Sequence, residues 1–339
     1  MIPGHVHRLM NVFVAGATGV LGRRVVDECA DRGHDVVGLT RDDEGDEVVR
    51  ERGGEPRRGD VLDRSSVVDA AVEADADVVV HAATAIPTDT NPDEKDWELN
   101  DRVRREGAEN LVAAVGEAGA DRFVQQSIVW VARQPDGGQF DEDAEPHPDR
   151  STRSALEAEK TVEDAADEGG FDAVVLRGGN FYAHDAAHTR SFAEDLLSRD
   201  LPVVGRGLLG RKDATLSFVH ADDAGRAFAD AVEGEPTGTF HVVDDEPVTW
   251  ATFVNELGER LDAPSPRRVP AWLARFAVGD NVLRLITRPM PTTNDRFGEA
   301  FGWEPEYPTV RDGLDAVVER WREDGVLRET EDGYVWNTD

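Results

Sequence analysis

Three glycines spaced three residues apart constrain the fold of this 339-residue chain more than any other feature. Gly16, Gly19 and Gly22 stand between a short apolar run, 11–15, and a helical stretch, 21–32. In such a strand–turn–helix unit the first glycine permits a tight turn, the second lets the backbone approach a pyrophosphate, and the third lets the helix pack on the strand. The amides of the first helical turn then face the anion. The pattern predicts a dinucleotide-binding turn formed by Gly16, Thr18, Gly19, Val20, Leu21 and Gly22.

The residues after the second predicted strand, 35–39, bear on which dinucleotide binds. A site for NAD usually places an acidic side chain there, where it binds the ribose hydroxyl groups. Here Arg41 comes first, and a guanidinium can pair with a 2′-phosphate through two parallel hydrogen bonds. Asp42 follows directly and keeps NAD as the alternative. We therefore expect NADP as the preferred cofactor.

Short apolar runs alternate with longer amphipathic stretches over the first half of the chain. We predict strands at 11–15, 35–39, 55–58, 78–81, 122–126 and 173–177, and helices at 21–32, 65–73, 93–118 and 153–168. Runs such as Val78-Val79-Val80 lack polar alternation, as do strands that helices cover on both faces. This alternation predicts an α/β fold with a Rossmann-type, doubly wound parallel sheet.

The rhythm changes after residue 178, and we expect a smaller C-terminal α/β lobe that holds the substrate. The predicted division is an NAD(P)-binding domain over 10–180 and a substrate lobe over most of 181–325, with 211–243 partly returning to the first sheet. Within the lobe we predict an irregular segment at 178–210, strands at 216–219 and 239–243, and helices at 221–233, 250–261 and 310–320. The acidic stretch 134–149 is expected to form a mobile surface loop in the place of a lid.

The charge balance excludes two classes of partner. The chain has 70 Asp and Glu against 37 Lys and Arg, a net charge of −33. Nucleic acids and anionic membranes select clustered basic residues, so neither is expected as a partner. Lysine occurs only at Lys95, Lys160 and Lys212. Excess carboxylates with scarce lysine suit molar salt, where a Debye length of about 3 Å screens repulsion, so we expect a halophilic protein.

Cysteine usage and hydropathy bear on the compartment. The single cysteine, Cys29, leaves no disulfide framework, which fits a reducing compartment. The longest apolar stretch, 78–86, is far shorter than the roughly 20 residues that a spanning helix needs. We expect a cytoplasmic protein whose residues 1–10 precede the first strand without regular structure.

A series of short motifs follows the glycine-rich turn. They are Gly59-Asp60-Val61-Leu62-Asp63, His81-Ala82-Ala83, Asn100 before a long helix, Gln126-Ser127, Leu176-Arg177-Gly178-Gly179-Asn180-Phe181-Tyr182, Phe218-Val219-His220-Ala221-Asp222-Asp223 and Phe301-Gly302-Trp303-Glu304-Pro305. In their order and spacing, these motifs resemble the extended or atypical short-chain dehydrogenase/reductase superfamily, the NAD-dependent epimerase/dehydratase family. The resemblance covers 11–320 and implies an NAD(P)-dependent oxidoreductase or isomerase of a carbonyl or alcohol metabolite, with a nucleotide sugar as the family-based example.

The resemblance also implies contacts for individual residues. The cofactor contacts fall at five positions: Asp60 and Val61 at the adenine, Ala82 and Ala83 at the phosphate and ribose, and Asn180 at the nicotinamide. Ser127 would be the catalytic serine that orients the substrate. Relatives commonly form homodimers through two long helices, which suggests a homodimer here. We further expect His81 to pack beneath the end of the sheet and Asp222 to cap a helix.

The catalytic pair that the resemblance leads us to expect is missing. The family uses Tyr-x-x-x-Lys, in which the tyrosine exchanges a proton and the lysine lowers its pKa from about 10. In the register that fits best, Ser151 stands at the tyrosine position and Ala155 at the lysine position. Lys160 follows five residues after Ala155, which is roughly 140° around a helix, so it cannot replace the lysine.

The remaining candidates for acid–base chemistry follow the sixth predicted strand. Tyr182 or His184 would serve as proton donor if this segment faces the nicotinamide. His184 and His188 are four residues apart, as in zinc-binding pairs, but no third ligand is evident and we expect no metal. The missing pair also supports an alternative: a non-catalytic NAD(P)(H)-binding sensor or a stabilising subunit.

Overall fold

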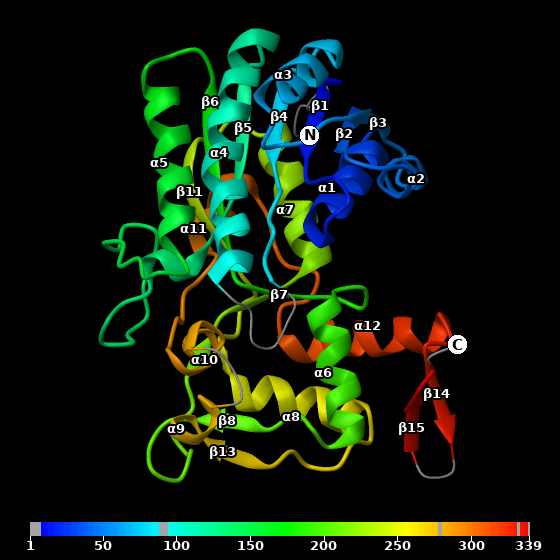
Figure 1. Ribbon diagram of the computed structural model, residues 1–339, viewed down its shortest axis with the longest axis vertical. Coiled ribbons are helices and arrows are strands. Elements are labelled where there is room, and N and C mark those ends of the chain that lie inside the picture. The colour runs from blue at the N-terminus through cyan, green and yellow to red at the C-terminus, as the bar shows by residue number, and fades with distance from the viewer. Residues whose placement is uncertain (1–7, 88–93, 277–279, 331–332, 338–339) are drawn as a thin grey trace, which may run out of the picture.

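The structure, a computed structural model, describes residues 8–87, 94–276, 280–330 and 333–337 (Figure 1). Its main sheet has seven strands, all parallel, in the order β11-β6-β5-β4-β1-β2-β3. They are β1 (Asn11–Ala15), β2 (Asp35–Thr40), β3 (Glu55–Arg58), β4 (Val78–His81), β5 (Arg122–Ile128), β6 (Asp172–Gly178) and β11 (Gly238–Val242). The strand order reverses between β1 and β4, so the sheet is doubly wound, and in sheets of this kind ligands bind where these two strands end.

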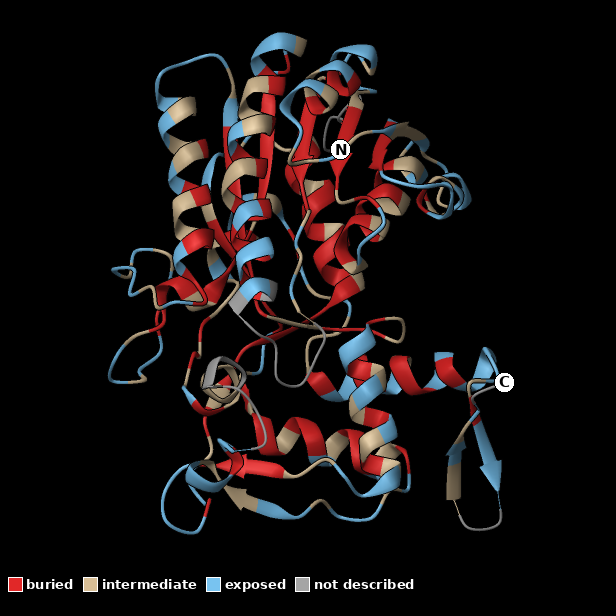
Figure 2. Cartoon of the chain, in the orientation of Figure 1, coloured by how far each residue is buried: buried red, intermediate tan, exposed pale blue. Residues whose placement is uncertain are grey.

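Side chains of β1 alternate between the two faces of the sheet and so contact two helix layers. Val12 and Val14 pack in one core cluster with α1 and α7, whereas Phe13 and Ala15 pack in another with α3, α4 and α5. These helices, together with α2 beside β2 and β3, are α1 (Val20–Asp31), α2 (Asp43–Glu51), α3 (Arg64–Glu73), α4 (Glu94–Ala118), α5 (Arg153–Asp167) and α7 (Ala221–Glu233). The predicted α/β fold is therefore confirmed, and Figure 2 shows the buried strands between half-exposed helices.

A smaller lobe lies below the carboxyl edge of the sheet in Figure 1. Its helices are α6 (Ala187–Ser198), α8 (Trp250–Arg260), α9 (Ala271–Ala274), α10 (Asp280–Thr287) and α12 (Val310–Glu323). The short helix α11 (Asp295–Phe301) packs instead beside β11 of the main sheet. Its two-stranded pairs are β7 (Asn180–Tyr182) with β10 (Phe218–His220), β8 (Val203–Gly205) with β13 (Arg268–Pro270), β9 (Thr215–Leu216) with β12 (Val248–Thr249), and β14 (Leu327–Thr330) with β15 (Gly333–Trp336). Aromatic packing forms its core, where the rings of Phe218 and Phe253 stack 4.6 Å apart. The chain then returns to the main sheet through α7 and β11, and we retain the division near residue 180 as a proposal.

The prediction of an irregular segment at 178–210 is wrong. That segment contains β7, α6 and β8. The apolar side of α6 that packs on the lobe is confined to its second half, around Phe192 and Leu196, while its first turns carry His188 and Arg190. A pattern that covers only one or two turns does not predict a helix from sequence.

The acidic stretch 134–149 is irregular, as expected, but it is fixed to the rest of the fold by hydrogen bonds. Phe140 is buried, and its carbonyl oxygen accepts a hydrogen bond from Thr292 Oγ1 at 2.7 Å. The backbone nitrogen of His241 donates to Glu142 Oε1 at 2.8 Å. These contacts hold the stretch against β11 and the segment before α11, so a lid role has no support in this arrangement.

The remaining expectations concern the chain start and the membrane. Residues 1–7 of the start expected to lack regular structure lie outside the described residues, and 8–10 carry no helix or strand. Among the described helices, none combines the length and the apolar content needed to cross a bilayer.

Candidate functional site

The glycine-rich turn joins β1 to α1 at the carboxyl edge of the sheet. Gly16 has φ +89°, and a Cβ atom there would lie 2.5 Å from the backbone nitrogen of Ala83. A Cβ atom on Gly22 would lie 2.0 Å from the carbonyl oxygen of Gly16. The amide of Gly19 donates to that same oxygen at 3.0 Å. Close backbone contacts therefore require glycine at positions 16 and 22.

The first turn of α1 suits an anionic group. The helix begins at Val20 after Gly19, with no side-chain cap and no acidic residue in the first turn. Thr18 and Gly19 are exposed, whereas Leu21 is buried beneath them. Amide groups left without a helical partner, together with the helix dipole, attract a phosphate. The residues present therefore fit the pyrophosphate of a dinucleotide.

The charged side chains at the ends of β2 and β3 differ in whether they already have a partner. Asp42 caps α2, and its carboxylate accepts from the backbone nitrogen of Gly45 at 2.8 Å. Arg58 is bound to Asp46 at 2.9 Å. Arg41 is exposed and forms no ion pair with any described residue. The carboxylate that would favour NAD is thus occupied by a helix cap, while the guanidinium next to it is available.

The remaining predicted cofactor contacts lie along the same edge. Ala82 follows β4 and donates its backbone hydrogen bond to Ala15 at 2.9 Å. Asp60 is exposed, and its carboxylate accepts from Leu62 at 2.9 Å, which holds the turn after β3. Val61, beside Asp60, is partly buried. The fold thus brings these residues to the strand ends that border the crevice, and their cofactor contacts stay predictions.

Ser127 lies near the end of β5, and its side chain contacts α5. It is 3 % exposed, and its hydroxyl donates to Glu159 on α5. Glu159 also accepts two hydrogen bonds from Arg177 of β6, at 2.9 and 2.7 Å, and all three side chains are buried. The serine is therefore part of a buried polar cluster between the sheet and α5, and nothing in this geometry directs it to a substrate.

Ser151 and Ala155 occupy the positions predicted for the catalytic pair. Ser151 is buried, and its hydroxyl donates to Asp149 Oδ1 at 2.6 Å. Ala155 is buried in the first turn of α5, and Lys160 is exposed further along that helix. Lys160 therefore contributes no cation near Ser151, as the helix geometry predicted.

Tyr182 is buried in the core of the smaller lobe. It is 1 % exposed, and its hydroxyl has no hydrogen-bond partner among the described residues. A Cβ atom on Gly313 of α12 would lie 2.1 Å from this hydroxyl. Burial raises the pKa of Tyr182 well above its usual range, and the carboxylates of Asp244 and Asp223 raise it further. These features do not support a role as proton donor.

His184 is half-buried beside α1. Burial lowers its pKa, and its neighbour Asp185 pairs with Arg23 and Arg24 of α1 at 2.9 Å each. This segment therefore packs against α1, close to the glycine-rich turn. His188 instead binds the carbonyl oxygen of Phe181 at 2.7 Å. No cluster of three metal-binding side chains occurs among the described residues.

Three further side chains have structural contacts. His81 is 1 % exposed and binds Gln125 at 3.0 Å, as expected for a residue packed beneath the sheet end. Asn180 donates to the carbonyl oxygen of Ser217 at 3.2 Å. The expectation that Asp222 caps a helix is wrong, because α7 begins at Ala221 and the side chain of His220 caps it.

Comparison with known proteins places this geometry in a family. The model of the NAD dependent epimerase/dehydratase family matches residues 12–242. The chain belongs to that family. A Streptomyces protein named 3-diazoavenalumate denitrifying reductase is 36% identical over 314 residues, which span 90% of this chain and 99% of that protein.

Solved structures of family epimerases share the fold. A UDP-glucose 4-epimerase from Thermotoga maritima, solved with UDP-glucose, has a TM-score of 0.76 and 19% identity, covering 93% of this chain and 99% of the other. A UDP-glucose 4-epimerase from Thermus thermophilus, solved with NAD, has a TM-score of 0.75 and 23% identity over 92% and 99% of the two chains.

Within this family fold, two residues beside Ser151 escaped the sequence analysis. Arg104 of α4 is buried and donates to the carbonyl oxygen of Ser151 at 3.2 Å, and burial lowers its pKa to about 10. Asp149 accepts from Ser151 and from Arg133. Arg104 lies one helical turn after Asn100 and one before Ala108, and all three are on the buried side of α4. This four-residue spacing is the sequence signal that could have identified Arg104.

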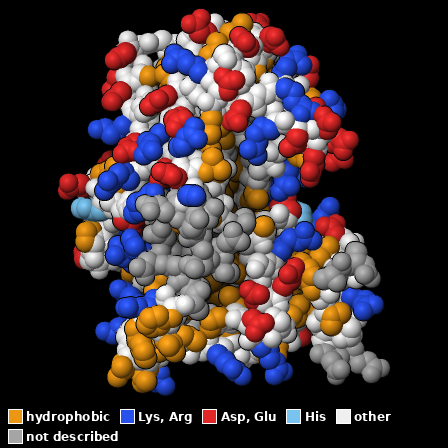
Figure 3. Space-filling model, in the orientation of Figure 1, with side chains coloured by type: hydrophobic (Ala, Val, Ile, Leu, Met, Phe, Trp, Pro, Cys, Tyr) orange, Lys and Arg blue, Asp and Glu red, His pale blue; other side chains and the backbone are white. Residues whose placement is uncertain are grey.

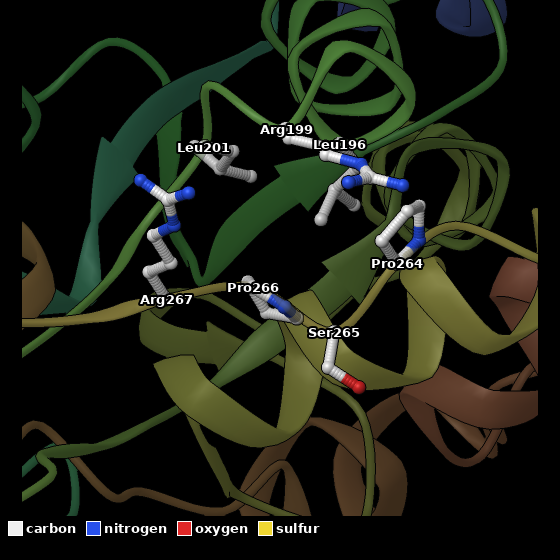
Figure 4. Close-up of a pocket in the computed structure, with 7 residues that line it drawn as sticks. All are labelled: Leu196, Arg199, Leu201, Pro264, Ser265, Pro266 and Arg267. Carbon is white, nitrogen blue, oxygen red and sulfur yellow. The ribbon is translucent and has the colours of Figure 1, made fainter.

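A shallow depression in the smaller lobe is not the predicted site. It measures about 120 Å³ and is lined by the seven residues labelled in Figure 4. They belong to α6, the segment after it and the segment before β13, and include no residue predicted to bind cofactor or substrate. The candidate site is therefore the crevice at the carboxyl ends of β1, β4 and β5.

Proposed function

We propose that the chain is an NAD(P)H-dependent reductase that passes hydride to a small-molecule acceptor, with NADP(H) as its preferred cofactor. The observation that carries the proposal is the open first turn of α1 behind Gly16, whose backbone contact with Ala83 leaves no room for a side chain. A bound dihydronicotinamide would supply the hydride. The chain's own residues would hold the pyrophosphate at α1 and orient the acceptor at the ends of β4 and β5.

The acceptor proposed is one whose reduction consumes no proton from the protein. Carbonyl reduction needs a proton at oxygen, which a positioned acid supplies. Here the hydroxyl of Ser151 donates to Asp149, and that of Ser127 donates to Glu159. Tyr182 is buried with a raised pKa. An electron-poor acceptor that becomes neutral when it gains hydride fits these side chains better than a ketone does.

A diazonium group has this property, and the Streptomyces relative supports it by name. When hydride reaches the carbon of R–N2⁺, a C–H bond forms and the C–N bond breaks. N2 leaves with the electron pair of the C–N bond, so R–N2⁺ and H⁻ give R–H and N2 without a proton. The carbon is reduced, and the dihydronicotinamide that gives the hydride is oxidised.

Two other functions stay open to test. A carbonyl or alcohol substrate such as a nucleotide sugar follows from the family, and it would need a donor such as His184, which lies beside α1. A non-catalytic NAD(P)(H)-binding sensor or subunit is favoured by the burial of Tyr182 and by the hydroxyl contacts of Ser151.

The decisive experiment measures whether deuterium is transferred from the cofactor to the product. NADPH deuterated at C4 is mixed with the protein in molar KCl and either a hydroxyaryl diazonium salt or a panel of aldehydes and ketones. We expect deuterium in the arene product, a rate that is flat between pH 6 and 8, and no carbonyl turnover. Carbonyl turnover alone would replace the diazonium proposal, and NADPH binding without turnover would favour the sensor. A reaction without protein sets the background.

The cofactor preference is tested at the end of β2. Replacement of Arg41 by Gln removes the exposed guanidinium, and we expect NADPH affinity to fall about 10-fold because one charge-assisted hydrogen-bond pair is lost. NADH affinity should stay the same. Fluorescence titration of both cofactors measures this, with Arg64→Gln on α3 as the control for an exposed arginine elsewhere. Equal losses for NADPH and NADH would show that Arg41 does not bind the 2′-phosphate.

A further inference from the structure

Five large apolar side chains are exposed together at the far end of the smaller lobe. We call this surface the apolar tip: Leu208, Leu209, Trp272, Leu273 and Phe276. Leu208 is 81 % exposed and Phe276 is 77 % exposed. In Figure 3 the apolar atoms gather at the lower left, over α9 and the β8–β13 end of the lobe. Water-exposed apolar surface of this extent in one place marks an interaction site.

Chain segments from two parts of the sequence build the apolar tip. The loop after β8 carries Leu208 and Leu209, and α9 with the residue pair after it carries the others. The pairing of β8 with β13 holds the two segments together, and Trp272 Nε1 donates to the carbonyl oxygen of Leu208 at 3.3 Å. The guanidinium of Arg275 lies 5.0 Å from the Phe276 ring. The tip is therefore part of the folded lobe.

The local charge around the tip is opposite to that of the molecule. The stretches 206–212 and 264–276 contain no Asp or Glu, although acids outnumber bases by 33 over the whole chain. Five exposed cations border the tip: Arg206, Arg211, Lys212, Arg267 and Arg275. None of these five pairs with a carboxylate among the described residues, whereas Arg268 is held by Asp213 at 2.7 Å. This acidic chain thus places five exposed cations without a carboxylate partner among the described residues beside a group of exposed apolar side chains.

We propose that the apolar tip docks on a lipid surface with anionic headgroups. Trp, Phe and Leu side chains at a protruding end, bordered by Arg and Lys, are the composition that enters the headgroup boundary of a bilayer. The cations would bind the headgroups while the apolar side chains insert. The net charge of −33 argues against lipid as a partner of the whole surface, but the acidic faces would point away from a bilayer touched only by this end.

A second copy of the chain fits this surface less well. Two copies meeting through it about a two-fold axis would bring the same five cations together, with no acid in either stretch to neutralise them. A contact between the tip of one copy and an acidic face of another would be heterologous, and it would give either a ring or an open chain of copies. Charge complementarity therefore favours an anionic lipid surface.

Flotation with vesicles tests the proposal on the full chain. Vesicles of equal parts phosphatidylglycerol and phosphatidylcholine are compared with pure phosphatidylcholine, at the lowest KCl concentration that keeps the native circular dichroism spectrum. We expect binding to the anionic vesicles only. The double variant L208S/F276S should lose about 10-fold or more of this binding. The double variant R206Q/R211Q should lose roughly 5-fold for each charge removed.

Matched variants provide the control. V72S/L99S removes exposed apolar side chains from α3 and α4, and R64Q/R328Q removes exposed arginines far from the tip in sequence. Both should bind vesicles as the unchanged chain does. No binding, equal binding to both vesicle types, or binding that the tip variants leave unchanged would overturn the proposal. Light scattering without vesicles tests for contact between copies. If the measured mass of the chain is lower in L208S/F276S than in the original chain, the tip is a contact between copies instead.

Discussion

At the scale of single residues, backbone geometry explains why the glycine-rich turn could be predicted from the sequence and the direction of Ser127 could not. The positive φ of Gly16 and the contact of Gly22 with the carbonyl oxygen of Gly16 arise within the turn itself, so the glycine spacing was sufficient to locate the glycine-rich turn. The direction of Ser127 was not predictable in the same way, because successive side chains of a strand point to opposite faces. Ile128 packs towards the smaller lobe, while Ser127 meets Glu159 on the other face. If the family motif is aligned one residue earlier or later on β5, the residue matched to the catalytic serine changes from one face of the sheet to the other.

Gly16→Ala should abolish measurable binding of NADPH. The added methyl group would lie 2.5 Å from the backbone nitrogen of Ala83, and φ +89° is unfavourable for alanine. Gly116→Ala is the control, because its Cβ meets nothing within 4 Å in the helix α4, and it should stabilise the chain by about 0.5–1 kcal/mol. Fluorescence titration and chemical denaturation measure the two effects. Unchanged affinity in Gly16→Ala would remove the dinucleotide assignment.

The ion pair of Glu159 and Arg177 should be a major determinant of stability. Glu159→Gln leaves a buried guanidinium without its counter-charge, and we expect the free energy of unfolding to fall by about 3–5 kcal/mol. Glu157→Gln, two residues earlier on α5, removes the partner of Arg105 where both side chains are over two-fifths exposed. That control should change stability by less than about 0.5 kcal/mol. Equal effects of the two substitutions would contradict the account.

At the scale of elements, strands were predicted better than the short helices. Buried parallel strands are continuous apolar runs, and all seven strands of the main sheet stand within two residues of their predicted bounds. The helix α2 had no prediction because charged residues dominate it, and the β14–β15 pair had none because each of its strands has only four residues. The smaller lobe is built from short elements whose packing, not their own periodicity, determines them.

Three strand-associated histidines should make stability depend on pH. Burial lowers the pKa of His81 and His220 to about 4 and that of His241 to about 3. The unfolded chain, with values near 6.5, binds protons that the native state cannot, so stability falls as pH drops from about 6.5 to 4. Each histidine should contribute of the order of 3 kcal/mol to this fall.

A single variant isolates this effect from the opposing carboxyl groups. Burial raises the pKa of Asp223 and Asp244, and such groups favour the native state at low pH. We therefore compare slopes: His81→Gln should flatten the dependence of unfolding free energy on pH between 6.5 and 4, relative to the original chain. Parallel slopes for the original chain and His81→Gln would show that His81 does not titrate on unfolding.

At the scale of the whole molecule, charge and salt should act together. The net charge of −33 opposes both folding and the approach of a phosphate, and salt screens that repulsion. We expect a higher melting temperature in 3 M than in 0.1 M KCl and tighter NADPH binding with rising salt. Calorimetry and fluorescence titration measure these. Equal or higher stability in dilute salt would contradict the halophilic interpretation, and affinity that falls steadily with salt would contradict the account of binding.

The path of the chain through the main sheet has a consequence for biosynthesis. The sheet strand β6 ends at Gly178, but its outer neighbour β11 begins only at Gly238, after much of the smaller lobe. A chain emerging from the ribosome therefore exposes one side of an apolar strand until the later segment follows, and open strand edges invite pairing between chains. Transcripts truncated between these two strands should yield insoluble protein, although the whole glycine-rich turn has already been translated.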